Sequence, residues 1–433
     1  MRRLFRSLLH TTLALCLALC VGLGVLAWFT LEDAPLVENS GPPTPQQVKE
    51  ARQFVRDLRT AINTDVSQQS SFTTTEAELN SFMKLGARFI PGFRGSLSLQ
   101  GDELRGAASI PVPKTGKWIN LRAAAPEFDD GLSPSRVEVG AVSIPPSIAL
   151  GLARAGGNLA IGDGFGDTVL NAARSMRIEE DRVAFELVMS DVGTNGIMRG
   201  VFGSLRGSEM PDASMIDRYY LSIRDAMERG ELPTEGSYLP YITYTLDAAQ
   251  QGSAEEGDAN AYTSAIMALT LVCGAKDFTL VVGGMVGDEF AKEGNWTKSC
   301  SDLTLNGRID SRRHFTTAAA LQAASNRGFA VSVGEFKELY DTVKAGGFDF
   351  TDIAANNSGI RMSNTFMATP AAEWPDLQSR IRSENDVIIR YDGIPQIMSG
   401  EDFERQYGDV ESAAYKDMLG FIEARISALP LHR

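Results

Sequence analysis

The spacing of hydrophobic positions changes several times along the chain, and each change marks a predicted element. The first run is continuous: residues 8 to 31 carry no charged side chain, three arginines precede them at positions 2, 3 and 6, and two acidic residues follow. A stretch of this length can cross the ~30 Å hydrocarbon core as a helix. Arginines on the near side favour a cytoplasmic N-terminus. Residues 1–31 are therefore predicted to be a single-pass signal anchor, with the rest of the chain outside that membrane.

A cleaved secretory signal is the alternative interpretation of this run. Such signals have a shorter apolar core that ends in a small-x-small cleavage site. Here the apolar stretch continues through Trp28 and Phe29 without a clear site of that kind. The sequence therefore favours a retained anchor.

Residues 32–65 are predicted to form a linker followed by an amphipathic helix. The linker ends in Gly41-Pro42-Pro43, and Thr44 and Gln47 then have the spacing of a capping box. Apolar residues continue at helical spacing as far as Ile62.

Residues 66–192 are predicted to form an α+β domain. Thr75 and Glu78 begin a second helix with another capping box. From Gly95 the apolar period becomes two, which predicts a β-hairpin with its turn at Gly101-Asp102. The same pattern predicts strands at 118–124 and 136–144, short helices at 147–154 and 168–175, and a last hairpin around 180–181. We expect one twisted antiparallel sheet.

Residues 193–433 are predicted to form a second, mostly α-helical domain. The expected helices span 213–229, 238–250, 258–273, 314–324, 333–343, 351–361, 370–383, 400–407 and 412–429. The predicted fold class is therefore α+β, with an N-terminal transmembrane helix, an antiparallel-sheet domain and a helical domain.

Charge narrows the range of partners. The chain of 433 residues has a formal net charge of −14, and no basic block follows the N-terminal arginines. Nucleic acid is therefore not an expected partner. An acidic body is also repelled by anionic headgroups, which argues against extensive charge-driven adhesion to a membrane.

Two cysteines, Cys273 and Cys300, lie outside the predicted anchor. In an oxidising compartment a lone pair of cysteines commonly bonds, so we predict a disulfide. Two separate thiols are the alternative. Neither cysteine has a second Cys or His nearby, so no zinc site is expected, and no cofactor is indicated.

The most concentrated set of polar residues runs from position 314 to position 356. Glu338 and Asp341 are three residues apart, so a helix would place both carboxylates on one side. Asp352 and Asn356 are four apart on the next helix, and His314 precedes both pairs. If the helices pack together, this set suits a divalent cation or general acid–base chemistry.

A structural interpretation of the same residues stays open. Asp349 is well placed to cap a helix, with Asp352 beside the positive end of its dipole. A lone histidine is more often a hydrogen-bonded core residue than a catalytic one.

The order of these motifs resembles that of VanZ-like and YfiM-like bacterial envelope proteins. The resemblance covers about 50 residues and rests on His314-Phe315, Lys337-Glu338-x-x-Asp341, Gly347-Phe348-x-Phe350-x-Asp352 and Ala354-Ala355-Asn356-x-x-Gly359. It departs at Asp349, where the pattern has serine, and at Asn356, where YfiM-like members have aspartate. In VanZ-like proteins these helices lie in the membrane, whereas here the segment carries several charged side chains. The mechanism of these families is not established, so the resemblance implies no reaction.

A broader resemblance concerns a family of uncharacterised proteobacterial proteins anchored in the inner membrane. It rests on Glu76-x-Glu78-Leu79-Asn80, on Trp118-Ile119-Asn120-Leu121 and on the closing Phe403-x-x-x-Tyr407-Gly408. The first domain is similar to membrane-tethered YpmS-type proteins and to tubular lipid-binding folds. This implies a bacterial inner-membrane protein with a cytoplasmic N-terminus, a periplasmic body and a role in the cell envelope.

Two functions follow as hypotheses. The first is non-catalytic binding of a lipid, a glycan or a protein partner; a lipid would occupy an apolar groove between sheet and helix, lined by Leu97, Leu99, Ile110 and Val139. The second is a metal- or acid/base-dependent hydrolase or transferase acting on an envelope polymer. Its candidate residues are His314, Glu338, Asp341 and Asp352.

Overall fold

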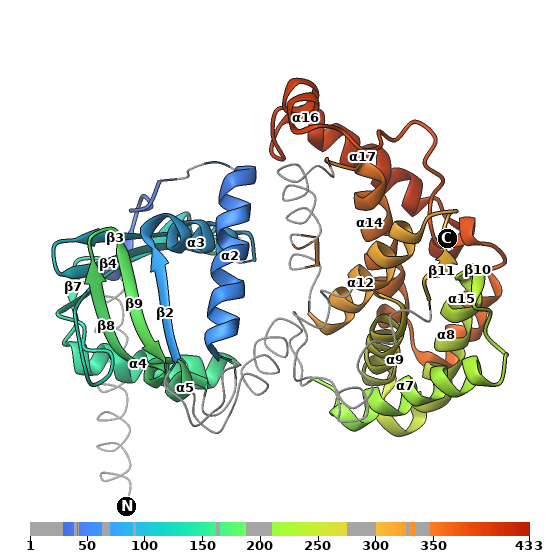
Figure 1. The fold of residues 1–433 in the computed structure, drawn as a ribbon, viewed down its shortest axis with the longest axis horizontal. Coiled ribbons are helices and arrows are strands. Elements are labelled where there is room, and N and C mark those ends of the chain that lie inside the picture. Colours follow the sequence, from blue (N-terminus) through green and yellow to red (C-terminus); the bar gives the residue numbers. More distant parts are fainter. Residues whose placement is uncertain are drawn as a thin grey trace, which may run out of the picture. The chain divides into compact units, whose positions relative to one another are not determined.

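The computed structural model describes residues 29–38, 41, 43–62, 70–89, 92–161, 165–187, 210–274, 300–325, 330–331, 333 and 347–433. The chain is a mixed α+β protein with antiparallel sheets and several helices, which confirms the predicted class at this level (Figure 1). It divides into unit 1, residues 1–40, 53–155 and 169–188, and unit 2, residues 41–52, 156–168 and 189–433.

The predicted anchor lies outside the described residues except for positions 29–31. Residues 29 and 30 are helical, and residue 31 already belongs to a strand. Among the helices that the structure describes, none has the length and apolar character needed to cross a membrane.

Unit 1 contains two antiparallel sheets, where the sequence predicted one. The larger has the order β3 (Arg94–Gln100), β4 (Glu103–Val112), β5 (Lys117–Pro126), β6 (Arg136–Val139) and β7 (Val142–Ser143), and β1 (Leu31–Glu32) also pairs with β5. The smaller has the order β2 (Ser70–Thr75), β9 (Arg182–Leu187) and β8 (Ala173–Glu179).

The predicted hairpin at Gly101-Asp102 is confirmed, because Gln100 pairs with Glu103 across that turn. The single strand predicted over 136–144 is instead the hairpin β6–β7. Gly140 has φ +58°, which reverses the chain there at little cost to a residue without a Cβ. The helix predicted over 168–175 also ends early, at residue 172 of α5.

The helices that the structure describes between these strands along the chain are α2 (Pro45–Ile62), α3 (Glu76–Phe89), α4 (Pro146–Ile161) and α5 (Phe165–Ala172). Both predicted capping boxes are present. Thr44 N–H donates to Gln47 Oε1 at 3.0 Å, and Thr75 N–H donates to Glu78 Oε2 at 2.9 Å.

The core of unit 1 lies among α2, α3 and the two sheets, and Phe54 of α2 is buried in it. Phe72 of β2, Leu79 of α3 and Met176 of β8 are buried in it. Leu97, Leu99 and other apolar residues of the larger sheet pack against this cluster. This core therefore covers one end of the apolar face of the larger sheet.

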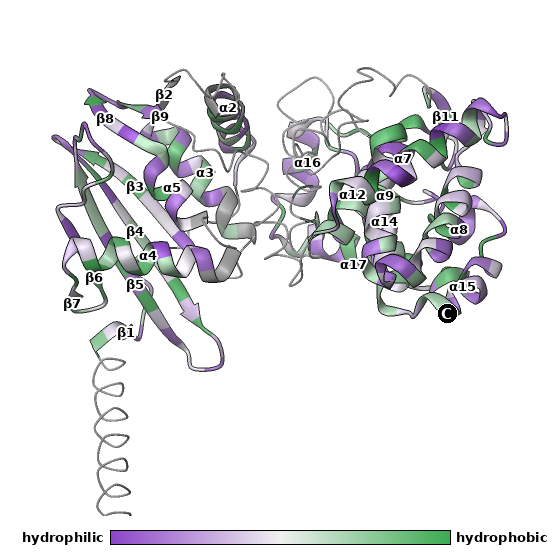
Figure 2. Cartoon of the chain, turned by 90° about the horizontal axis from the view of Figure 1, so that it is seen from below, coloured by the Kyte–Doolittle hydropathy of each residue, from purple (hydrophilic) through white to green (hydrophobic). Residues whose placement is uncertain are grey.

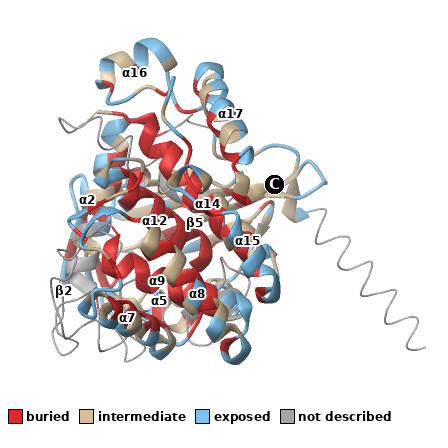
Figure 3. Ribbon diagram, turned by 90° about the vertical axis from the view of Figure 1, so that its right-hand side faces the viewer, coloured by how far each residue is buried: buried red, intermediate tan, exposed pale blue. Residues whose placement is uncertain are grey.

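Unit 2 is mostly helical, as predicted. Its described helices include α7 (Ala213–Glu228), α8 (Leu239–Glu256), α9 (Asp258–Cys273), α12 (Ile309–Ala324), α14 (Phe350–Ala368), α15 (Trp374–Ser379), α16 (Gly400–Tyr407) and α17 (Ala413–Ser427). A short parallel pair, β10 (Glu235–Ser237) with β11 (Asp302–Thr304), joins them. Buried residues concentrate in α9, α12 and α14 (Figure 3). The helix predicted over 333–343 lies outside the described residues except for position 333.

Cys273 ends α9, and Cys300 lies just before β11. The two residues are at disulfide distance, with Cα atoms 5.3 Å apart, as the sequence predicted. Both are fully buried.

Candidate functional site

Two of the four residues predicted to carry chemistry lie side by side in unit 2. His314 Nε2 on α12 lies 3.0 Å from Asp352 Oδ2 on α14. His314 Nδ1 lies 3.1 Å from Asn356 Oδ1, one helical turn further along α14. The predicted convergence of the imidazole, this carboxylate and the amide is therefore present. Glu338 and Asp341 lie outside the described residues.

A close approach of two helix backbones makes this contact possible. Gly359 of α14 has no side chain, and a Cβ added there would lie 2.1 Å from the carbonyl oxygen of Phe315 on α12. One turn later, Ser363 Oγ donates to the carbonyl oxygen of Ala319 at 2.8 Å. The small residues on α14 therefore let its polar first turns reach the imidazole of α12.

A second charged group, Arg308, joins this cluster. Its guanidinium lies 2.9 Å from Asp349 Oδ2, is 3.9 Å from Asp352 Oδ1, and also donates to Thr351 Oγ1. Burial lowers the pKa of Arg308, but the hydrogen bond and the negative charge of Asp349 outweigh that effect and raise it above its ordinary value. Arg308 is thus a permanent cation between the two aspartates.

Asp349 also has the structural role that the sequence suggested. Its carboxylate caps α14 by accepting the Thr351 N–H at 2.8 Å. Beside it, Tyr391 donates to Ser311 Oγ at 2.7 Å, and burial raises the pKa of that phenol to about 12. The cluster therefore joins the beginnings of α12 and α14 through hydrogen bonds and ion pairs.

Burial limits what this cluster can do. His314, Asp352 and Asn356 expose only 7%, 7% and 5% of their surface in the structure. An imidazole next to a carboxylate has the geometry of a general base with its orienting partner. A substrate must still reach the ring, and the described residues leave it almost covered. Within the described ranges, no group of three or more His, Cys, Asp or Glu side chains could hold a metal ion.

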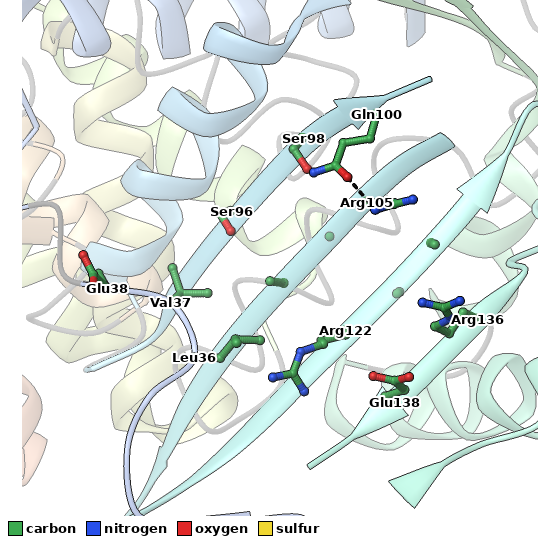
Figure 4. Close-up of a pocket in the computed structure, with 14 residues that line it drawn as sticks. Leu36, Val37, Glu38, Ser96, Ser98, Gln100, Arg105, Arg122, Arg136 and Glu138 are labelled. Carbon is green, nitrogen blue, oxygen red and sulfur yellow. Dashed lines mark hydrogen bonds between the residues drawn. The ribbon is translucent and has the colours of Figure 1, made fainter. Parts of the chain in front are cut away.

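Unit 1 offers an open site of a different kind. A pocket of about 550 Å³ lies on the polar face of the larger sheet, beside residues 36–38 (Figure 4). Strand pairing explains its shape. Arg105 and Arg136 flank Ala124 in one cross-strand row, and Arg122 lies between Ala107 and Glu138 in the next. Long side chains therefore form the walls, and alanines leave the floor hollow.

The segment beside the pocket is fixed to the sheet by two fully buried polar residues. Ser109 Oγ accepts the backbone N–H groups of Leu36 and Val37 at 2.9 and 3.0 Å. Asn120 Oδ1 accepts the Leu36 N–H at 3.0 Å. Of the segment predicted as an extended linker, Glu32 therefore belongs to strand β1, and residues 36–37 are hydrogen-bonded to side chains of the sheet.

The three arginines of the pocket differ in their partners. Arg105 forms an ion pair with Glu103 at 3.2 Å and donates to Gln100. Over the described part of the chain, the side chains of Arg122 and Arg136 form no hydrogen bond or ion pair, although both backbones belong to the sheet. Glu138 faces Arg122 across the strands without an ion pair between them. Two guanidinium groups are thus available to an anionic ligand.

The four residues predicted to line a lipid groove occupy the opposite face of this sheet. Leu97 and Leu99 pack against the core of unit 1. Ile110 and Val139 are half-buried. Their binding role stays a prediction. In β3 the alternation of Ser96 and Ser98 with Leu97 and Leu99 indicates a polar face opposite the apolar one. The arginines of that polar face come from three different strands, so no local pattern in the sequence groups them.

No family model, curated protein or solved structure matches the chain. The resemblance to VanZ-like, YfiM-like and YpmS-type proteins therefore stays a prediction.

Proposed function

We propose that the chain is a non-catalytic binding protein of the bacterial cell envelope, held in the inner membrane by residues 1–31. Its ligand carries an anionic group that binds in the sheet pocket of unit 1. The N-terminal charge pattern supports the anchor and a periplasmic body. The cysteine pair supports an oxidising compartment.

The observation that carries the binding proposal is the pair of unpaired guanidinium groups in an open hollow. Arg122 and Arg136 lie on adjacent strands of the pocket wall, and the alanine floor between them leaves room for a ligand. Arginine forms two parallel hydrogen bonds with a carboxylate or a phosphate, so both anions fit this geometry. Anionic lipids and glycans share that chemistry.

The test uses the full chain purified from its native membranes. Mass spectrometry of the co-purifying molecules would compare wild type with the double variant Arg122→Gln/Arg136→Gln. Arg177→Gln is the matched control, since Arg177 is on the other sheet of unit 1 and forms an ion pair with Asp129. We expect an anionic lipid or glycan in the wild type and the control, and its loss in the double variant.

Inorganic phosphate, added in increasing concentration, should compete with the co-purifying anion for the same site, and its affinity gives a second measurement. A charge-assisted hydrogen bond contributes roughly 1.5–3 kcal/mol, so removing one arginine should weaken binding at least about tenfold. If the double variant keeps both the co-purifying anion and the phosphate competition, the pocket is not the binding site.

A second function, acid–base hydrolysis or group transfer on an envelope polymer, is favoured by one distance only. His314 Nε2 lies 3.0 Å from Asp352 Oδ2. Asp352→Asn keeps the shape of the side chain and removes its charge. If that variant folds normally and loses a hydrolytic activity of the wild type on isolated envelope polymer, the catalytic proposal replaces the binding one.

A further inference from the structure

Helix α4 is an apolar helix that remains unburied in unit 1. Over positions 146–158, where its side chains are described, none is buried. Ile148 and Leu152, one turn apart, are 54% and 60% exposed. Hydrophobic positions recur along α4 in Figure 2. Exposed apolar surface of this kind marks a contact with a partner or a membrane.

The sequence of α4 makes such a contact necessary for a stable helix. It contains Gly151, Gly156 and Gly157, and glycine is a poor helix former in water. An isolated helix of this length is marginal even with good helix formers, and most helices in proteins are stabilised by packing of an apolar face. Within the described residues, Ile148 and Leu152 gain no such packing.

The chain itself places the start of α4 near Phe29, one of the last residues of the predicted anchor. The carbonyl oxygen of Phe29, at the end of the apolar run, accepts the Ala141 N–H at 2.8 Å. A Cβ at Gly140 would lie 2.6 Å from the same oxygen, so this close contact requires a glycine. Pro146 begins α4 five residues after Ala141, a reach of at most about 18 Å. Phe29 is itself 51% exposed.

Length and charge indicate how α4 would meet the bilayer. Its 16 residues correspond to about 24 Å, which is too short to span a core of about 30 Å. Between Ile144 and Gly162 the only charged residue is Arg154, so this segment carries no acidic side chain that anionic lipid headgroups would repel. The acidic charge of the whole chain is therefore not concentrated on this segment.

We infer that α4 lies along the surface of the membrane that holds residues 1–31, with Ile148 and Leu152 in the lipid. This inference rests on the anchoring in the proposed function. It adds a second contact, which would hold unit 1 in one orientation on the bilayer and keep its sheet pocket at a fixed height. A protein partner on α4 is the outcome that the test must distinguish.

The test is photo-cross-linking of the full chain in vesicles of phosphatidylethanolamine and phosphatidylglycerol. The photoreactive residue p-benzoyl-phenylalanine replaces Leu152 in one variant and Leu221 in the control. Leu221 is an exposed leucine on α7 of unit 2, at 39% exposure. We expect lipid adducts at position 152 to exceed those at position 221 by at least fivefold.

A second measurement does not depend on the probe. Hydrogen exchange of the amides of 147–155 in the vesicle-bound chain should accelerate at least tenfold in Ile148→Ser/Leu152→Ser, while exchange in α3 stays unchanged.

Two outcomes overturn the inference in different ways. If the chain resists carbonate extraction but position 152 yields no more lipid adduct than position 221, the anchor stands and α4 does not touch lipid. A protein adduct at position 152 in native membranes, without a lipid adduct, would likewise show that α4 contacts a protein partner and not lipid. If carbonate releases the chain, the anchoring proposal fails and the inference falls with it.

Discussion

Replacing Gly359 by alanine tests the packing of α12 on α14, on which the buried His314 cluster depends. The new Cβ would lie 2.1 Å from the carbonyl oxygen of Phe315, where ordinary contact begins at 3.4 Å. The two backbones must therefore separate by about 1.3 Å at this point. No side chain can rotate away to relieve the contact, because the obstacle is a backbone atom.

The magnitude follows from two opposing effects. Overpacking a core costs about 1–3 kcal/mol, and a backbone obstacle favours the upper end of that range. The change from glycine to alanine within a helix returns about 1 kcal/mol. We expect Gly359→Ala to lower the free energy of unfolding of unit 2 by about 2 kcal/mol. For a unit of this size that corresponds to a melting temperature lower by about 4–8 °C.

Gly420 on α17 provides the matched control. It is exposed, and an added Cβ would meet no atom within 4 Å. Gly420→Ala should therefore stabilise unit 2 by about 0.4–1 kcal/mol and raise its melting temperature by about 1–4 °C. Differential scanning calorimetry of the full chain measures both, and the transition that shifts with Gly420→Ala identifies unit 2. If Gly359→Ala melts at or above the wild-type temperature, α12 and α14 do not approach as closely as described.

Three further predictions concern unit 2. Reducing the Cys273–Cys300 pair, 27 residues apart, should destabilise the unit by roughly 3–4 kcal/mol, and unchanged melting in reductant would contradict this. Burial, aided by the charge of Arg361, lowers the pKa of His432 to about 4 from 6.5, so the folded state favours the neutral ring. Its stabilising effect should be complete above pH 6.5 and fall as the pH drops toward 4. In His432→Gln, the free energy of unfolding measured with urea should therefore depend less on pH between 6.5 and 4 than in the wild type. Burial raises the pKa of Tyr391 to about 12 from 10, so stability should fall as the pH rises from 10 toward 12. Tyr391→Phe should weaken that pH dependence. In a pH titration followed by absorbance at 295 nm, the variant should have one tyrosine fewer that ionises near pH 12.

Elements with local signals could be predicted from the sequence. The hairpin of β3 and β4 has a two-residue turn and a period of two, and both capping boxes form the expected hydrogen bonds. Each of these features is determined within a few residues, so a single sequence contains it.

Elements that depend on a distant partner could not be predicted. Strand β2 consists of Ser70–Thr75 and has only one apolar residue, Phe72. It is a strand because Phe72 pairs with Phe185 of β9, more than 100 residues away. The two residues of β1 likewise depend on Ile119 and Trp118 of β5. Neither partner is visible from the local pattern.

The candidate site shows the same division. Spacing predicted that Asp352 and Asn356 share one side of a helix, and they both face His314. Arg308 and Tyr391 were missed, because both lie outside residues 314–356, the segment whose polar spacing carried the prediction. These two residues change the interpretation, since the Arg308 cation stabilises the two aspartates and the Tyr391 phenol is hydrogen-bonded to Ser311 of α12.

The histidine cluster and the sheet pocket differ in whether their charged side chains already have partners within the protein. Around His314, the described charges already have partners within the protein, and burial makes each partner costly to remove. In the sheet pocket, Arg122 and Arg136 keep their charge in an open hollow without an internal partner. A guanidinium that faces the solvent is hydrated without a ligand, and it forms stronger, charge-assisted hydrogen bonds when a carboxylate or phosphate displaces that water. Sequence spacing makes the histidine cluster visible because its residues recur at helical spacing, whereas the pocket arginines are spread over three strands. Exposure and the absence of side-chain partners favour the pocket beside residues 36–38 as the site that binds a ligand.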